Sequence, residues 1–438
     1  MTTLASSNTV SLGRQPILDA KQQVIGYELL CRDAATDMAA ANRLKGDAGA
    51  TDVLVSALVE IGLDSVVGDR LAFVNFSKPF LDGTTDIPHQ ADQLVVEVPP
   101  SVEIDEAVAS GIRKLSEQGY RIALSDFVYS PRWDPLLPYA DIIKLDVTKL
   151  TEKQLRAHVQ LLNDNDIAAL AVNVETHEQY EMCSELGCAL LQGHFFSQPN
   201  VVDGKVVRTS YSALIQTLAA VNTLEAGPDE IEAAVSQDPA LAHKLMKFVN
   251  SSAYGRRSPV DSVQQAIVYL GKETVRRMVN LLLMTSVNDK PTVLTRTALV
   301  RATACKNLAH AMGEPNQDAF FTVGLLSLID AMLDRPLDGI VQELPVTDAF
   351  KEALLEHRGA MGACLDAVIA FELNEPLAPD NLPLMVSDQC KAYLDAVTSV
   401  EQNEGMASML PSSGRRIDEA AFRGSAYSKQ LAAATAEA

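Results

Sequence analysis

Six polar side chains lie within or at the carboxyl ends of short apolar runs in the first 200 residues. They are Glu28, Asn75, Glu97, Asp126, Lys144 and Gln192. Carboxylate and amide oxygens ligate divalent cations, and a lysine ammonium binds phosphate oxygens. If these side chains meet at one place, we expect a site for a divalent metal and a phosphate-bearing ligand. Taken singly, each could also be a strand end that meets solvent.

Strands and helices must alternate to bring these six residues together. The β-rich runs are Val24–Leu30, Leu71–Phe76, Leu94–Val98, Arg121–Leu124, Ile142–Leu145, Ala168–Val172 and Ala189–Phe195. The amphipathic helical patterns between them are Asp52–Ile61, Ile104–Gln118, Glu152–Asn163 and Glu175–Leu186. This alternation predicts a parallel α/β sheet. In a (β/α)8 barrel, side chains at the carboxyl ends of the strands gather at the face where active sites are built.

At these residues the chain resembles the EAL family of cyclic di-GMP phosphodiesterases, over about residues 10–200. The segment Tyr27–Arg32 resembles the EALLR signature, with Leu29 where the family has alanine. Four later segments resemble the VNLS, ELTE, IKID and QGY motifs of the family. They are Phe73–Ser77, Val96–Val98, Ile143–Asp146 and Gln192–Phe195. The resemblance implies a TIM-type (β/α)8 barrel.

The resemblance also implies roles for individual residues. In active members, two divalent cations hold the scissile phosphate and activate water. The metal-site residues that remain are Glu28, Asn75, Glu97 and Asp126, and the vestiges of the catalytic set are Glu28, Asp126 and Lys144. The candidate ligand-binding residues are Arg32, Asn75, Lys144 and Gln192. Two interpretations stay open: a nucleotide pocket without turnover, and an inherited fold in which Glu28 and Lys144 form an ion pair.

The family's pattern is broken at three positions of this site. Where the family has DDFGTG, the chain has Ser125–Ser130, so a serine replaces the first aspartate. Where the family has AEGVET, Val172 replaces the glutamate, and a valine can neither ligate a metal nor accept a proton. Pro100 replaces the second glutamate of ELTE. These changes predict that hydrolysis is lost and that no cofactor is required, with Mg²⁺ or Mn²⁺ relevant only to residual phosphodiesterase activity.

From about Ser210, helical patterns replace the strand signals. They are Ser210–Val221, Asp229–Ser236, Pro239–Val249, Ser262–Leu270, Glu273–Met284, Arg296–Met312 and Asp318–Leu333. We expect Asp238 and Ser262 to cap helices, and Gly271 to end one. The sequence therefore predicts an all-helical second domain.

Two segments of this helical half resemble the HDOD domain, a signalling output module related to HD hydrolases. They are Gln237–Ser251 and Ser262–Gly271. An HD hydrolase needs a His-Asp pair to hold metal, but the chain has Ser327 and Leu328 at the matching place. We therefore expect this domain to be non-catalytic.

Composition and charge exclude several classes of partner. The chain has 438 residues and a formal net charge of −21, which argues against binding a nucleic-acid backbone or an anionic membrane. No run approaches the roughly 18–20 apolar residues of a membrane span, and the first residues lack the features of a secretory signal. The 6 scattered cysteines are expected to be reduced core thiols. We expect a cytoplasmic protein with no nucleic-acid or membrane partner.

Together these patterns predict an EAL-like barrel at residues 1–203, an HDOD helical domain at 204–400 and a C-terminal tail at 401–438. By resemblance, the expected function is non-catalytic regulation through contacts with signalling proteins in cyclic di-GMP-linked pathways such as motility or biofilm control. The alternatives are a cyclic di-GMP receptor and a weak cyclic di-GMP phosphodiesterase. The sequence names no partner protein and leaves a homodimer open.

Overall fold

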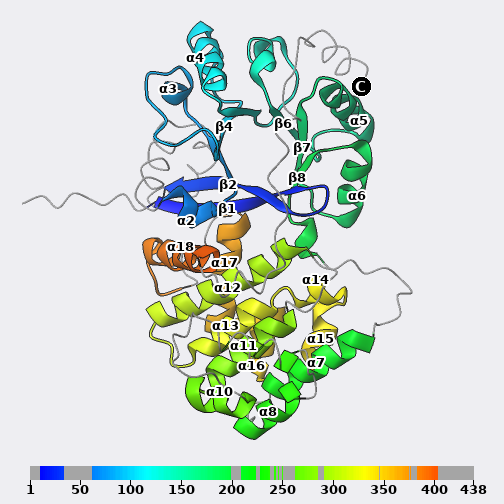
Figure 1. The fold of residues 1–438 in the computed structure, drawn as a ribbon, viewed down its shortest axis with the longest axis vertical. Coiled ribbons are helices and arrows are strands. Elements are labelled where there is room, and N and C mark those ends of the chain that lie inside the picture. The colour runs from blue at the N-terminus through cyan, green and yellow to red at the C-terminus, as the bar shows by residue number, and fades with distance from the viewer. Residues whose placement is uncertain are drawn as a thin grey trace, which may run out of the picture. The chain divides into compact units, whose positions relative to one another are not determined.

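The computed structural model divides into two compact units (Figure 1). The first contains Met1–Phe195 and the later segment Glu372–Pro376, and the second contains Phe196–Phe371 and continues from Leu377. The structure describes residues 10–33, 62–198, 209–222, 227–236, 262–284, 291–344, 346–373 and 382–402, together with Leu241, Ala242, Leu245, Val249 and Glu375. The first unit is built around a closed eight-stranded barrel. In the described part of the second unit, the regular elements are helices.

The barrel closes in the strand order β1 to β8. The strands are β1 (Val10–Asp19), β2 (Val24–Asp33), β3 (Leu71–Asn75), β4 (Leu94–Val98), β5 (Arg121–Leu124), β6 (Ile142–Asp146), β7 (Ala168–Val172) and β8 (Leu190–Gln192). From β2 to β8 the neighbouring strands are parallel. The carboxyl ends of these strands therefore lie at one face of the barrel.

The first strand is antiparallel to both of its neighbours, β2 and β8. The predicted parallel sheet is therefore confirmed from β2 to β8 but not at β1, a strand that was absent from the predicted runs. Gly13 and Pro16 lie inside β1, and both residue types are depleted in strands. A tight turn from Asp19 to Gln23 joins β1 to β2, and a connection this short permits only an antiparallel pair.

Helices of the first unit follow the strands and carry clear start signals. They are α2 (Leu63–Val67), α3 (Lys78–Leu81), α4 (Glu106–Glu117), α5 (Glu152–Asn163) and α6 (His177–Leu186). Thr151 and Thr176 begin α5 and α6 with capping boxes, which satisfy the free N–H groups of the first turn. Figure 1 shows α5 and α6 flanking β7 and β8. The predicted helix Asp52–Ile61 lies outside the described residues.

One apolar cluster fixes the barrel strands against each other. Its buried members come from β1 and from β3 to β8: Ile17, Phe73, Val95, Ala123, Ile142, Ala168, Leu170, Val172 and Leu190. Because these side chains are close-packed, the strand ends that carry the polar residues are held in fixed positions.

The second unit contains eleven described helices. They are α7 (Thr209–Asn222), α8 (Pro228–Ser236), α10 (Val263–Leu270), α11 (Lys272–Met284), α12 (Thr292–Ala311), α13 (Gln317–Leu326), α14 (Ile329–Leu333), α15 (Leu337–Glu343), α16 (Asp348–Leu355), α17 (Gly359–Leu373) and α18 (Val386–Gln402). The longest, α12, packs against α13 and α18. None of the described helices combines the length and the apolar character that crossing a bilayer requires.

Two of the expected helix boundaries in this unit are confirmed. The Ser262 hydroxyl accepts a hydrogen bond from Gln265 N at 3.1 Å and so caps α10. Gly271 ends α10 with a φ of 83°, a conformation that favours glycine. The expected cap Asp238 and most of the segment Gln237–Ser251 lie outside the described residues.

The single helix predicted over Asp318–Leu333 is instead two helices. The break between α13 and α14 lies at Ser327 and Leu328. The Ser327 hydroxyl donates a hydrogen bond to Gly324 O at 2.8 Å. Such side-chain bonds compete with the helical ladder, which explains why an apolar pattern that looks continuous in the sequence is interrupted here.

Candidate functional site

A lysine ammonium lies between two carboxylates at the carboxyl ends of the barrel strands. Lys144 Nζ is 2.9 Å from Oε2 of Glu28, and 2.9 and 3.1 Å from the two carboxylate oxygens of Glu97. These residues come from β6, β2 and β4, so the closure of the barrel brings them together. All three are buried, Glu97 completely. The ion pair between Glu28 and Lys144, one of the two interpretations that the sequence left open, is therefore present.

Two amide side chains extend this network around Glu28. Gln192 Nε2 donates to Oε2 of Glu28 at 2.6 Å, and Asn75 Nδ2 donates to Oε1 at 3.2 Å. Gln192 Nε2 also donates to Oε1 of Gln15 at 2.8 Å. Gln15 lies on β1 opposite Glu28, and the sequence analysis missed it because it did not recognise this strand. The sequence feature that could have indicated this residue is a polar glutamine within the largely apolar run Leu12–Leu18.

The backbone beside Gln192 is as closely constrained as its side chain. Gly193 has a φ of 156°, and a Cβ at this position would lie 1.9 Å from Val174 O. Only glycine leaves room for the two backbones at this distance. This close approach explains why a glycine follows Gln192, the last residue of β8.

Two of the three replaced positions of the family pattern, Ser125 and Val172, supply no negative charge. Ser125 follows β5, and its hydroxyl donates to Oε2 of Glu97 at 3.0 Å. Val172 ends β7 and belongs to the apolar cluster of the barrel. Each position contributes a neutral group where a carboxylate would add a negative charge. The anionic groups that contact Lys144 are therefore Glu28 and Glu97.

Asp126 is not brought into the Lys144 network, as judged from the contacts of the described residues. Its Oδ1 is 3.4 Å from Lys149 Nζ, and its side chain is 42% exposed. Its φ of 46° turns the chain sharply directly after Ser125. Lys149 also contacts Asp146 at 3.0 Å. Of the vestigial metal-site residues, Asp126 is thus engaged with a different lysine.

The side chain of Arg32, another predicted ligand-binding residue, lies outside the described part of the structure, although its backbone belongs to β2. At the rim of the site, His194 Nδ1 lies 3.6 Å from Oε2 of Glu175. The hydrogen bond from His194 lowers the pKa of the Glu175 carboxyl. His194 stands where the EAL family has a tyrosine, so the rim differs chemically from the family pattern.

The pKa values of the two buried carboxylates shift in opposite directions. Burial acts to raise the pKa of Glu28, but the Lys144 charge and the hydrogen bonds from Gln192 and Lys144 outweigh it, so its pKa is lowered. Burial and the neighbouring Glu28 charge raise the pKa of Glu97 to about 7. Burial acts to lower the pKa of Lys144, but the two carboxylates outweigh it and raise that pKa. Near neutral pH, Lys144 and Glu28 are charged and Glu97 is partly protonated.

These donors do not fit a pair of divalent cations. Two cations about 3.5–4 Å apart need bridging carboxylates to offset their charge. Here the Lys144 ammonium contacts both carboxylates, and Glu97 holds a proton for part of the time near pH 7. Among the described residues there is no group of three or more His, Cys, Asp or Glu side chains arranged to hold a metal. Glu28, Asn75 and Glu97 could hold one cation only if Lys144 moved.

In the helical unit, Ser327 occupies the place where the sequence analysis sought a His-Asp pair. Arg301 Nη1 donates to its hydroxyl at 3.2 Å. Nearby, burial raises the pKa of Asp330, while Arg301 acts against that rise. A guanidinium beside a hydroxyl lacks the ligands by which HD hydrolases hold metal.

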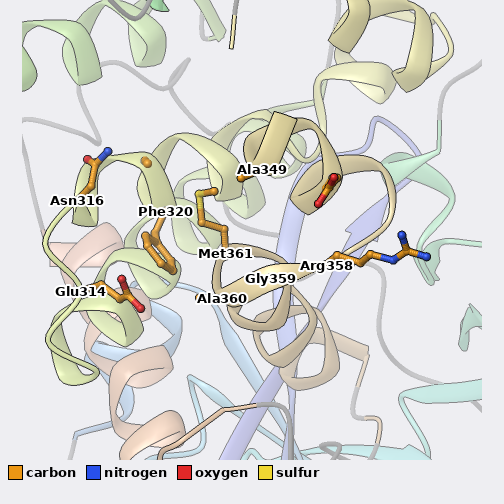
Figure 2. A pocket seen from close by; sticks show the side chains of 10 residues that line it. Glu314, Asn316, Phe320, Ala349, Arg358, Gly359, Ala360 and Met361 are labelled. Atoms are coloured by element: carbon orange, nitrogen blue, oxygen red, sulfur yellow. The ribbon is translucent and has the colours of Figure 1, made fainter. Parts of the chain in front are cut away.

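A cavity of 240 Å³ lies elsewhere in this unit, between the α12–α13 turn, α16 and the start of α17. Figure 2 shows Glu314 and Phe320 near each other, while the Arg358 side chain extends away from the rest of the lining. None of the residues that the sequence predicted for a site lines it.

Comparison with known proteins matches two domain families. The EAL domain model matches residues 81–199, and the HDOD domain model matches residues 209–333. The uncharacterized protein YuxH of Bacillus subtilis is 30% identical over 374 residues, covering 83% of this chain and 91% of that protein. The cyclic di-GMP phosphodiesterase CdgJ of Vibrio cholerae is 31% identical over 368 residues, covering 83% of this chain and 85% of that protein.

Solved structures match the first unit at lower identity. The crystal structure of an EAL domain protein from Listeria monocytogenes is 21% identical, with a TM-score of 0.34. The match covers 45% of this chain and 94% of that one.

Proposed function

The chain belongs to the family of proteins that join an EAL domain to an HDOD domain, and from this premise we propose that it is a non-catalytic signalling protein. In this proposal the chain acts through contacts with other signalling proteins in cyclic di-GMP-linked pathways, such as those of motility or biofilm formation. We place it in the cytoplasm. The EAL barrel takes residues 1–203, the HDOD domain 204–400, and a tail 401–438.

The observation that carries the proposal is the absence of two carboxylates, at the positions where the chain has Ser125 and Val172. The carboxylates that remain are engaged with Lys144, a residue that the family pattern also has. The Lys144 ammonium contacts Glu28 and Glu97, the carboxylates that would otherwise face a metal. Hydrolysis of a phosphodiester also needs a group that takes a proton from water. Val172, which stands where the family has a glutamate, cannot do this. A site with one ammonium between its two remaining carboxylates and no base at Val172 supports a role other than hydrolysis.

Signalling without turnover requires a difference in binding. A partner or ligand shifts a protein between two states only by as much as its affinities for those states differ. The proposed regulator therefore needs two conformations that its partner protein distinguishes, and no chemical step.

A second function, binding of cyclic di-GMP without cleavage, is favoured by two observations. Asn75, Lys144 and Gln192, whose types bind phosphate oxygens or guanine edges, remain together at the barrel mouth. In addition, the relative from Vibrio cholerae is named a cyclic di-GMP phosphodiesterase. The name of that relative also supports a third alternative, weak hydrolysis of cyclic di-GMP, in which Glu97 and Asp126 would act with one metal.

The deciding experiment incubates the purified full chain with cyclic di-GMP and Mn²⁺ or Mg²⁺ and measures the linear product by chromatography. We expect no product above the enzyme-free blank. The matched variant Ser125→Asp/Val172→Glu restores both carboxylates, and product from this variant alone would support the assignment of the loss to these positions. Linear product from the natural chain that Glu28→Ala abolishes would overturn the proposal. Calorimetric titration of the chain with cyclic di-GMP tests the second function. A Kd below about 10 μM, which corresponds to a binding free energy near −7 kcal/mol, favours a receptor.

A further inference from the structure

Two cysteines close the carboxyl end of α6. Cys188 N donates to Cys183 O at 3.0 Å, and Gly187 N donates to Ser184 O at 3.1 Å. Gly187 between them has a φ of 87°. These two bonds and the left-handed glycine define a Schellman motif, in which the first and last side chains contact each other. In most proteins that contact is apolar, but here it is made by two thiols.

The thiols of Cys183 and Cys188 are hydrogen-bonded to each other and buried, with 0% and 2% exposure. Both cysteines are free in this structure. The hydrogen bond between the thiols already brings the two sulfur atoms into contact, and an S–S bond of about 2.05 Å would require a further approach of the two side chains. We propose that Cys183 and Cys188 are a redox modification site, at which hydrogen peroxide or a similar two-electron oxidant forms a reversible disulfide.

The hydrogen bond gives the two sulfur atoms different roles. The bond from Cys188 lowers the pKa of the Cys183 thiol, against the effect of its burial. The same bond, together with burial, raises the pKa of Cys188. Because the thiolate is the nucleophile, Cys183 reacts first and Cys188 resolves the product.

The reaction proceeds in two balanced steps. The Cys183 sulfur attacks one peroxide oxygen, so an S–O bond forms, the O–O bond breaks, and the departing hydroxide takes the Cys183 proton to become water. The Cys188 sulfur then attacks the Cys183 sulfur, so the S–S bond forms, the S–O bond breaks, and the second hydroxide takes the Cys188 proton. The two sulfur atoms together lose two electrons, and the peroxide gains them. Because both thiols are buried, the oxidant enters when the last turn of α6 opens locally.

A disulfide here would lie at the amino end of β8, the end opposite the barrel mouth. Cys188 lies two residues before β8, the strand that carries Gln192. Gln192 in turn donates hydrogen bonds to Glu28 and Gln15. The disulfide would therefore covalently link the last turn of α6 to the short connection that leads into β8.

The test treats the folded full chain with hydrogen peroxide and removes the peroxide. It then unfolds the chain in the presence of an alkylating agent, so that every remaining thiol reacts, and digests the product with a glutamyl endopeptidase. This enzyme cleaves after Glu185, which lies between the two cysteines. We expect two peptides joined by a disulfide that a reductant separates. Cys364, whose pKa burial raises to about 12, is the internal control and should be fully alkylated.

Single variants test the order of the two steps. Cys188→Ser should leave a sulfenic acid at Cys183 that dimedone traps, whereas Cys183→Ser should give no adduct at Cys188. Circular dichroism of these variants and of Cys183→Val, which keeps an apolar side chain at the motif, checks that they fold. The proposal is overturned if both thiols of the folded chain are alkylated after peroxide treatment, or if the linkage forms only in urea.

Discussion

The barrel mouth and the contact between α7 and α11 both bury polar side chains, but only the barrel mouth buries opposite charges in one network. Lys144 contacts Glu28 and Glu97 in the barrel. In the helical unit, Asn222 and Asn280 exchange two amide hydrogen bonds of 2.9 and 3.0 Å. The amide pair is satisfied at any pH, whereas the charged network depends on the protonation of each member. The comparison shows that buried polarity can either specify helix pairing or create a site that responds to charge.

The largest effect on stability is expected from Lys144→Met. Removing the ammonium leaves two buried carboxylates facing each other, which typically costs about 3–5 kcal/mol. The single tryptophan of the chain, Trp133, is buried in the barrel unit, so its fluorescence during denaturant unfolding reports on this unit. Lys149→Met is the matched control, since Lys149 is 55% exposed and its loss should cost less than about 1 kcal/mol. Equal losses in the two variants would contradict the description of the barrel mouth.

The second largest effect is expected in the pH dependence of the unfolding free energy, which should distinguish the barrel mouth from the amide pair. The raised pKa of Glu97, about 7 against an ordinary 4.5, means that the folded state holds a proton that the unfolded state releases. This contribution to stability is fully present below about pH 4.5 and is lost as the pH rises past 7. We expect the natural chain to lose on the order of 1–3 kcal/mol relative to Glu97→Gln between about pH 5 and 7.5. Parallel unfolding curves of the two proteins across this range would argue against a buried, partly protonated Glu97.

The lowered pKa of Glu28 acts in the opposite direction and in a different range. Its contribution to stability is present above its ordinary pKa and is lost as the pH falls through the folded value. The window above pH 5 therefore isolates Glu97. Ionisable groups away from Glu97 are shared by the natural chain and the variant, so their effects cancel in the difference.

The amide pair should show a smaller effect without pH dependence. Asn280→Ala removes two hydrogen bonds to the half-buried Asn222 amide, which keeps its bond to Leu218 O, so the expected cost is about 0.5–1.5 kcal/mol. A double-mutant cycle with Asn222→Ala, followed by circular dichroism, measures the coupling between the two side chains. A coupling near zero, or one that changes between about pH 5 and 7.5, would remove the contrast with the barrel mouth.

Helix caps should give the smallest effects, and similar ones in both units. Thr151→Ala removes the capping box of α5 in the barrel unit, and Ser262→Ala removes the cap of α10 in the helical unit. Each should cost about 0.5–1 kcal/mol, because a cap acts only on local N–H groups. Denaturant unfolding compares the two, and a clear difference would show that a cap depends on the surroundings of its unit.

Most of the barrel could be predicted from the sequence, because buried strands and amphipathic helices leave distinct patterns. The strands from β2 to β7 lie within a few residues of the predicted runs. The first strand could not be recognised, since Gly13 and Pro16 hide its pattern and a hairpin, not a helix, connects it to β2. The break at Ser327 was also hidden, because one side-chain hydrogen bond ends α13 within an apolar segment.

The composition of the site was predictable, but its contacts were not. Barrel topology requires the carboxyl ends of parallel strands to meet, so six polar side chains were expected to lie together. Five of them do, and the sixth, Asp126, contacts Lys149 instead. The sequence could not show that one ammonium contacts both carboxylates, because this depends on side-chain rotamers. Nor could it show that Asp126 faces Lys149, which follows from its unusual φ of 46°.

The most direct test of the central claim, that this site does not seat two divalent cations, is anomalous scattering from crystals of the full chain grown with Mn²⁺. We expect the Lys144 ammonium to remain between Glu28 and Glu97, with no pair of manganese peaks beside them. Two well-occupied manganese sites about 3.5–4 Å apart at Glu28, Asn75 and Glu97, with Lys144 displaced, would contradict the account.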